Sequence, residues 1–222
     1  MTLPLDPARR RAPDARPQQI LDAALLVFGE QGLAGARLDD IARRAGIAKG
    51  TIYLYFANKE ELFREVVRQT LGTRLDELAE EFGRPARGTG AHTCADQLRA
   101  YMRTWWDALK EPAFRTIYRL VVGELHQFPD LMQFYLAEVV SRKVALHAGV
   151  IARGVAAGEF HATDPRVAAR MISSMFVTHA LWVARPLPPL AIVGDMSDDA
   201  VYAQLEDFAL RALRPDAAST SA

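Results

Sequence analysis

The polar residues best placed for chemistry lie in the stretch AGIAKGTIYLYF, residues 45–56. Lys49, Gly50 and Thr51 begin a predicted short helix and point away from its apolar side. A lysine, a hydroxyl and a glycine that permits close backbone approach can together contact the bases and phosphates of DNA. The expected chemistry is therefore recognition of a duplex by one helix, rather than catalysis.

Two short helices joined through Gly46, where a left-handed residue can end a helix, must position these residues. The first helix has apolar positions at helical spacing, at Leu38, Ile41, Ala42 and Ala45. The second has its apolar side at Ile52, Tyr55 and Phe56. A preceding helix from Pro17, closed by Gly29 and Gly32, would support the pair. This arrangement is typical of a helix-turn-helix unit.

The next helix begins with a cap. Asn58 can accept a hydrogen bond from the backbone N–H of Glu61, and the Glu61 side chain can reach back, as in a capping box. The helix then begins at Lys59, and its apolar positions continue to Phe82. We expect residues 59–82 to form a connector between the N-terminal unit and the rest of the chain.

The combined pattern resembles that of the TetR family of bacterial one-component transcriptional regulators, most closely between Pro17 and Phe63. The matching residues are Gly32, Asp40-Ile41-Ala42, Ala45-Gly46, Lys49-Gly50-Thr51, Tyr53-Leu54-Tyr55-Phe56 and Lys59-Glu60. Two positions depart from the family. Ala36-Arg37 stands where threonine and then serine or threonine is usual, and Ala48 where serine is common. Each change removes a hydroxyl cap, although Arg37 can replace a phosphate contact by its charge.

The candidate DNA contacts follow from these residues and from the resemblance. We expect base or groove contacts from Lys49, Gly50 and Thr51. Phosphate contacts are expected from Arg37, Arg44, Tyr53 and Lys59. Tyr55 either contacts DNA or packs. Taken singly, each lysine or arginine would be an ordinary solvated residue, and only its place within the motif favours the DNA role.

Composition excludes several other classes of protein. The 222 residues carry 27 basic and 27 acidic side chains, so a bulk nucleic-acid coat is not expected. A single cysteine, Cys94, excludes an internal disulfide, and no apolar run reaches membrane-spanning length, which favours the cytoplasm. The order of Lys49-Gly50-Thr51 does not fit a P-loop, and the histidines form no zinc or di-iron motif. We expect no enzyme activity, metal or cofactor.

The chain is expected to be all-α, with no strand-like alternation. Residues 1–15 are predicted to be a flexible basic arm, 16–63 the helix-turn-helix domain and 83–214 a helical C-terminal domain. Residues 215–222 are predicted to be a disordered tail. Within the C-terminal domain, helices are expected from about Thr93, from Pro165 after the Asp164 cap, and near Ser197.

The C-terminal domain combines bulky apolar side chains with a few polar ones, as in a bundle that encloses a small-molecule site. Most of these residues must fill the core. The candidate pocket residues are Trp105, Trp106, Tyr118, His126, Phe134, His147, Met175 and His179. The resemblance implies the same effector domain, and a homodimer formed by the last two helices of each subunit. The candidate interface residues are Met171, Phe176, Trp182, Val201, Leu205 and Phe208.

The resemblance implies a repressor that leaves a roughly palindromic double-stranded DNA operator when a small, mostly apolar effector binds. In that mechanism the effector shifts the connector helix and alters the separation of the two recognition helices. The alternative is a helical ligand-binding or protein-interaction module without DNA binding. Sequence-specific binding to DNA separates the two hypotheses.

Overall fold

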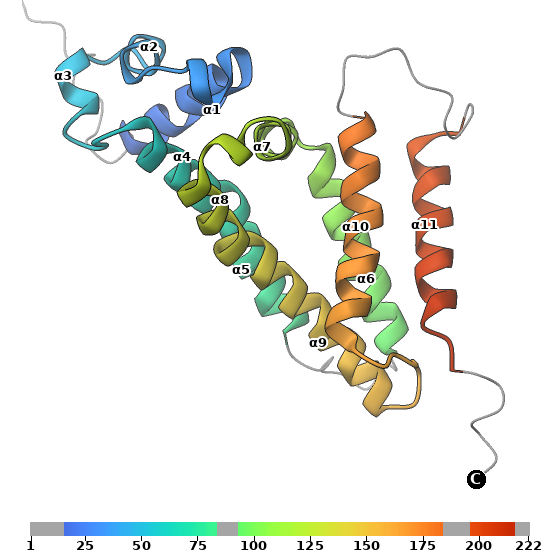
Figure 1. Ribbon diagram of the computed structural model, residues 1–222. Helices are drawn as coiled ribbons and strands as arrows, with labels where there is room; N and C mark the ends of the chain where they lie inside the picture. The colour runs from blue at the N-terminus through green and yellow to red at the C-terminus, as the bar shows by residue number, and fades with distance from the viewer. Residues whose placement is uncertain (1–15, 84–92, 184–195, 216–222) are drawn as a thin grey trace, which may run out of the picture.

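The computed structural model describes residues 16–83, 93–183 and 196–215, without the side chains of Arg16 and residues 180–183. Within these ranges the regular structure is helical and no strand occurs, which confirms the all-α prediction (Figure 1). No helix in the same ranges is long and apolar enough to cross a bilayer.

The helix-turn-helix unit comprises α1 (Arg16–Gly35), α2 (Leu38–Arg44) and α3 (Lys49–Ile52), packed against α4 (Lys59–Val67). Its core includes Phe28 and Phe63, whose rings meet edge to face at 5.8 Å between centroids. Helix α1 runs past Gly29 but breaks at Gly32, where φ is 73°, so the predicted close is correct at Gly32 and wrong at Gly29; a short helical segment continues to Gly35.

Local signals set most ends of these helices. Gly46 has a φ of 67°, which confirms the left-handed turn after α2. Arg37 and Ala48 occupy the N-cap positions of α2 and α3 without a side-chain cap, in agreement with the two departures. Asn58 accepts from the Glu61 N–H at 2.8 Å. The Glu61 carboxylate, however, accepts from Ala57 N–H rather than from the cap residue.

The predicted connector is continuous from Lys59 to Phe82. It consists of α4, a π-helical turn η3 (Arg68–Gly72) and α5 (Thr73–Phe82). Leu71, Leu75 and Leu78 are buried along it. In Figure 1 this helix runs from the helix-turn-helix unit toward the opposite end of the molecule.

The C-terminal part is a bundle around α9. Its elements are α6 (Cys94–Lys110), α7 (Pro112–Gly123), η4 (Leu125–Gln127), α8 (Pro129–Tyr135), η5 (Leu136–Ser141), α9 (Arg142–Ala156), α10 (Pro165–Val183) and α11 (Asp198–Ala212). Helix α9 packs on α5, α6 and α10, while α11 lies at the edge against α6 and α10. The cap at Asp164 forms as predicted, and the helices expected from about Thr93 and near Ser197 begin there, with Thr93 and Ser197 as their N-caps.

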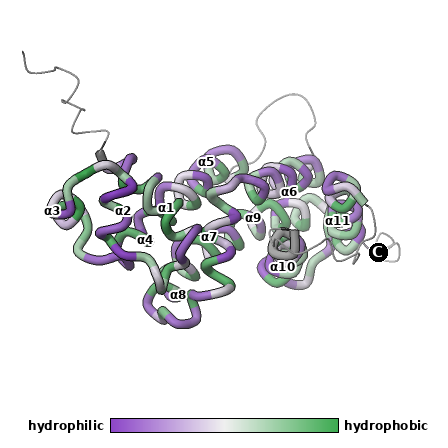
Figure 2. The backbone as a smooth tube through the Cα atoms, turned by 90° about the horizontal axis from the view of Figure 1, so that it is seen from above, coloured by the Kyte–Doolittle hydropathy of each residue, from purple (hydrophilic) through white to green (hydrophobic). Residues whose placement is uncertain are grey.

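Helices α7 and α8 connect the two halves. The Glu124 carboxylate, at the end of α7, accepts from Ala34 N–H of α1 at 2.9 Å. Arg119 donates to the Gly29 carbonyl of α1. The guanidinium carbon of Arg68, in the connector, lies over the ring of Phe134 of α8, 5.0 Å from the centroid of that ring. Both views place α3 at one end of the molecule and α11 at the other (Figure 1 and Figure 2).

Candidate DNA-binding and effector sites

The exposed face of α3 and the turn after it carry the candidate DNA contacts. Ile52 and Phe56 are buried and anchor the segment to the core, while Leu54 is 83% exposed and Tyr53 49% exposed. Tyr55 is 38% exposed, so it shares the open side and is not part of the predicted apolar face. The surface offered to a partner is therefore partly aromatic.

Asp39 of α2 holds two of these residues in place. Its carboxylate accepts from Lys49 Nζ at 2.7 Å and from the Tyr53 hydroxyl at 3.3 Å. The hydrogen bond from Lys49 lowers the pKa of Asp39, and the same bond raises the pKa of Lys49. Lys49 is thus aimed outward beside α2, with its charge already balanced by a neighbour.

Gly50 has open space where a side chain would be. A Cβ atom added to it would meet nothing within 4 Å. Its backbone lies in a helix at an ordinary φ. The fold of the free chain therefore does not require glycine here, and a requirement would come from a molecule that approaches α3 from outside.

The neighbouring arginines are mostly paired with acidic residues. Arg44 binds Glu30 of α1 through two hydrogen bonds, at 2.8 and 3.1 Å, and this contact raises the pKa of Arg44. Arg43 pairs with Asp40 one turn earlier. Arg37 is exposed at the start of α2. Positive charge on this face is therefore partly neutralised within the chain.

Lys59 has a structural role in the free chain. Its ammonium donates to the carbonyl of Ala34 at 2.7 Å and to that of Ala36 at 3.3 Å. A cation at the carboxyl end of a helix is favourable, and this one joins the end of α1 to the start of α4. The side chain predicted to bind phosphate is thus occupied by backbone carbonyls.

The interior of the C-terminal bundle contains a buried polar cluster, which we call the Lys143 cluster. Its members come from α6, α7, α8 and α9: Tyr101, Trp105, Tyr118, Tyr135, Lys143 and His147. The Tyr101 hydroxyl donates to the Lys143 carbonyl at 3.1 Å, and its ring lies 5.0 Å from that of His147. Lys143 Nζ lies 5.3 Å from the centroid of the Trp105 ring.

Burial dominates the electrostatics of this cluster. It lowers the pKa of Lys143 to about 8. Burial, followed by the charge of Lys143, lowers the pKa of His147 to about 3, so His147 is neutral. The hydroxyls of Tyr101, Tyr118 and Tyr135 have raised pKa values, chiefly through burial.

A second aromatic group lies where α6, α10 and α11 meet. Trp106 stacks on His179 with 5.2 Å between ring centroids, and Phe176 meets Trp106 edge to face at 5.9 Å. Tyr202 of α11 packs against both Trp106 and Phe176. These contacts fix α10 and α11 to the rest of the bundle.

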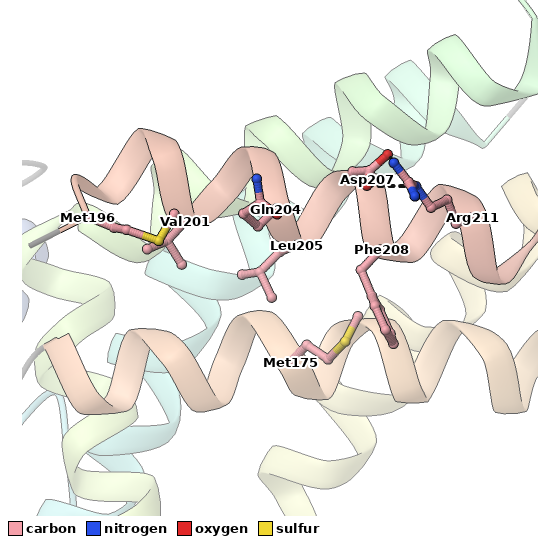
Figure 3. A pocket seen from close by; sticks show the side chains of 8 residues that line it. All are labelled: Met175, Met196, Val201, Gln204, Leu205, Asp207, Phe208 and Arg211. Atoms are coloured by element: carbon pink, nitrogen blue, oxygen red, sulfur yellow. Dashed lines mark hydrogen bonds and ion pairs between the residues drawn. The ribbon is translucent and has the colours of Figure 1, made fainter. Parts of the chain in front are cut away.

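Outside this group, α10 and α11 form an open apolar groove of about 560 Å³. Figure 3 shows Met175 on α10, with Leu205 and Phe208 of α11 pointing toward it. A second groove of about 480 Å³ shares Met175 and Phe208 and includes Met171. Met171 is 67% exposed and Phe208 62% exposed, so this face has large apolar side chains in contact with solvent.

Two family patterns match the chain. Residues 20–66 match bacterial regulatory proteins of the tetR family, and residues 87–198 match the tetracyclin repressor-like C-terminal domain. The second match alone spans half of the chain. The chain belongs to the TetR family. It is therefore a DNA-binding transcriptional regulator, from a family whose members are regulators rather than enzymes.

Similar proteins include regulators with known ligands. The chain is 28% identical over 167 residues to the fatty acid metabolism regulator protein of Bacillus subtilis (strain 168), covering 74% of this chain and 82% of that protein. FadR from Bacillus subtilis in complex with stearoyl-CoA has a TM-score of 0.69 at 23% identity, covering 88% of this chain and 98% of FadR. The SmeT–triclosan complex has a TM-score of 0.70 at 24% identity, covering 91% and 93%. These two structures show that the TetR fold is shared.

The structure divides the predicted pocket residues of this TetR chain among several places. Trp105, Tyr118 and His147 lie together in the Lys143 cluster, whereas Trp106 and His179 belong to the second aromatic group. Three residues lie elsewhere. His126 is exposed on η4, Phe134 faces the arginines of α4 and η3, and Met175 lines the outer groove.

The predicted interface residues also divide. Met171, Leu205 and Phe208 line the grooves between α10 and α11. Val201 also borders the larger groove but is only 6% exposed. Phe176 does not reach this surface, because it is 3% exposed and packs on Trp106 within the same chain. The side chain of Trp182 lies outside the described residues.

Sequence reasoning missed Lys143 as a site residue. From α8 to α9 every fourth residue is buried: Leu131, Tyr135, Val139, Lys143, His147 and Ile151. A lysine within that spacing was a detectable signal, because lysine is almost never fully buried without a partner. It was overlooked because a lone lysine on a helix is ordinarily solvated.

Proposed function

We propose that the chain is a homodimeric repressor that binds a roughly palindromic operator and leaves it when a small, mostly apolar effector enters the C-terminal bundle. The observation that carries this proposal is the contact between α7 and α1. Glu124 and Arg119 of α7 bind the backbone of α1 directly, and α7 also contributes Tyr118 to the buried Lys143 cluster. One helix thus touches both the bundle interior and the helix-turn-helix unit.

The DNA contacts are assigned to the exposed face of α3. Lys49, Gly50 and Thr51 meet the bases or groove, and Tyr53 and Tyr55 lie beside them on the open side. Arg37 and Arg44 contact phosphates, Arg44 by exchanging Glu30 for DNA. The phosphate contact predicted for Lys59 is assigned to the free N–H groups at the start of α4. The Lys59 ammonium itself is already hydrogen-bonded to the Ala34 carbonyl of α1.

The homodimer is supported by the apolar surface of α10 and α11. An exposed apolar face of this kind marks an interaction site, and a twofold pairing would cover Met171, Met175 and Phe208 on both subunits at once. Such a dimer places two α3 helices about one DNA turn, or a multiple of it, apart. The operator is then roughly palindromic, and the cytoplasm, where such DNA lies, is the compartment.

The response to effector requires two arrangements of the molecule. An effector that binds the bundle more tightly in the arrangement unable to bind DNA shifts the population toward that arrangement. Movement of α7 passes to α1 through Glu124, and movement of α8 passes to the connector through Phe134. SmeT with triclosan supports an apolar effector for this chain, and FadR with stearoyl-CoA supports an effector that carries an apolar chain.

Selection of bound fragments from genomic DNA by the purified chain tests the proposal. Enrichment of fragments that share one inverted repeat is expected, and the repeat alone should bind as a short duplex. A scrambled duplex of the same composition is the control. Equal binding of both duplexes across a salt series contradicts the proposal, because sequence-independent binding comes from phosphate contacts alone.

A further inference from the structure

Lys143 is a cation in the interior of the bundle. The whole residue is 6% exposed, and the other buried residues of α9 are apolar or neutral. Among the residues that the structure describes, no carboxylate lies within ion-pair distance of the ammonium, and the nearest assigned contact is the face of Trp105 at 5.3 Å. A charge removed from water without a counter-ion is costly.

The groups around Lys143 also lack acceptors. The indole N–H of Trp105 is buried and has no hydrogen-bond partner within the described part of the chain. The Tyr118 hydroxyl is buried as well and makes no hydrogen bond of normal length in that part, although its interaction with the Tyr135 hydroxyl adds to the effect of burial in raising its pKa. Both residues are at most 6% exposed. Tyr101 uses its own hydroxyl on the Lys143 carbonyl, so it leaves the ammonium free. One ammonium and two neutral donors therefore lie in one region, and none of the described residues supplies an anion there.

This chemistry matches one kind of ligand group. A carboxylate is acceptor-only when ionised, has two oxygens, and carries the single negative charge that one lysine can balance. The rings of Tyr101 and Trp105 beside the lysine, with Phe114 packed edge to face on Trp105, supply an apolar wall for the rest of such a molecule. A phosphate group with two charges, or the several charges of a coenzyme A thioester, would exceed the single buried cation.

We propose that the effector is an apolar monocarboxylate whose carboxylate binds the Lys143 ammonium, assisted by the Trp105 N–H and the Tyr118 hydroxyl. This inference rests on the proposed function, since it names the class of ligand for that effector site. The carboxylate would complete the hydrogen bonds that the donors lack, and burial would strengthen its attraction to the lysine.

Isothermal titration calorimetry with matched acid and amide pairs tests the inference. The pairs are dodecanoate with dodecanamide, 2-naphthoate with 2-naphthamide, and 4-phenylbenzoate with 4-phenylbenzamide. We expect at least one acid to bind the wild-type chain tenfold or more tighter than its amide. Lys143→Met should remove that preference, while the protein stays folded, because methionine keeps the apolar stem and removes a buried charge.

Lys110→Met is the matched control. Lys110 also lies over an indole, 5.6 Å from the Trp106 ring centroid, but it is exposed and paired with Asp107 and Asp199. This variant should keep the acid preference of the wild type. The inference is overturned if no acid exceeds its amide, if stearoyl-CoA alone binds, or if Lys143→Met retains the preference.

Operator binding is measured separately in the same samples. A chain that binds its operator and is released by an amide or by stearoyl-CoA, but not by an acid, keeps the proposed function and refutes the carboxylate. A chain that binds acids through Lys143 without binding any operator supports the site and refutes the repressor.

Discussion

At the scale of single residues, Asp39 sets what Lys49 can offer to DNA. The lysine must exchange a carboxylate 2.7 Å away for a phosphate or a base. Asp39→Asn should therefore increase affinity for random duplex DNA several-fold and steepen its salt dependence by up to about one unit of slope, because one more cation is released to the DNA. Fluorescence anisotropy at several salt concentrations measures both quantities.

The matched control for this change is Asp40→Asn. It removes the same charge from the same helix, but the partner is Arg43 instead of Lys49. If both variants change the affinity and the slope equally, the effect is one of net charge, and the specific role of Asp39 is refuted.

Gly50 should separate binding from folding. Gly50→Ala meets no atom in the free chain and should leave the melting temperature unchanged or higher, since alanine in a helix is favoured by about 0.5–1 kcal/mol. Operator affinity should fall tenfold or more, because the methyl group lies where DNA approaches. Gly46→Ala should instead lower the melting temperature measured by differential scanning calorimetry, because an alanine at the φ of 67° found here costs about 1–2 kcal/mol. Unchanged operator affinity for Gly50→Ala would remove Gly50 from the interface.

Lys143 should leave a signature in the pH dependence of stability. Its pKa is about 8 in the fold, below the value of 10.5 for a free lysine. Between these two values the unfolded chain binds more protons, so the folded state gains stability as pH rises through this window. The destabilisation caused by burying the charged Lys143 ammonium is fully present below about pH 8. Tyr101, Tyr118, Tyr135 and His147 of the same cluster are also present in the Lys143→Met variant, so their own titration cancels when wild type and variant are compared.

Urea unfolding of the effector-free chain at pH 7 to 10.5 measures this signature against Lys143→Met. The free energy of unfolding of the wild type should rise relative to the variant by an amount on the order of 1–3 kcal/mol. A constant difference between the two proteins would mean that Lys143 is not a buried cation.

At the scale of elements, the contact of α7 with α1 should carry the coupling between sites. Glu124→Gln keeps the shape of the side chain and weakens the bond to Ala34 N–H, so the effect of effector on operator affinity should drop several-fold. Titration of operator with and without effector measures this ratio. Glu111→Gln, at the other end of α7 and without a cap bond, is the control. An unchanged ratio in Glu124→Gln would exclude this route.

The elements also show what the sequence could and could not predict. Helix starts at Asn58, Asp164 and Ser197 were predictable because a cap depends on residues within one turn. The short helical segment after Gly32 was not predictable, because it lies where Glu124, 90 residues beyond Ala34, accepts a backbone N–H. The π-helical turns likewise follow from packing and not from local sequence.

The same division applies to the candidate sites. The outward residues of α3 followed from the spacing of Ile52 and Phe56, which the structure buries. The sequence did not predict which charged side chains have partners. Glu30 meets Arg44, and the Ala34 carbonyl meets Lys59, only in the folded chain. The pocket residues were scattered for a similar reason: an apolar helix face indicates burial but not which neighbour covers it.

At the scale of the whole molecule, the face of α10 and α11 should decide the oligomeric state. Phe208→Glu should leave the fold intact, because this side chain is 62% exposed, and should convert a dimer to a monomer at micromolar concentration. Operator affinity should fall with it, since one α3 then binds alone. Light scattering and operator titration measure the two effects.

Leu136→Glu serves as the control for the dimer face. Leu136 is 46% exposed on η5, away from the grooves of α10 and α11. It should retain the mass and the operator affinity of the wild type. A wild-type chain that is already monomeric, or a Phe208→Glu chain that stays dimeric, would contradict the assignment of this face.

The unbroken helix from Lys59 to Phe82 also has a mechanical consequence. At 1.5 Å per residue it is a lever about 36 Å long, so a tilt of only about 5° at one end displaces the other by about 3 Å. That displacement is close to the 3.4 Å step between stacked base pairs. Tilts of the connector too small to disturb the packing of the bundle would therefore be enough to move the two α3 helices out of register with the half-sites of the operator.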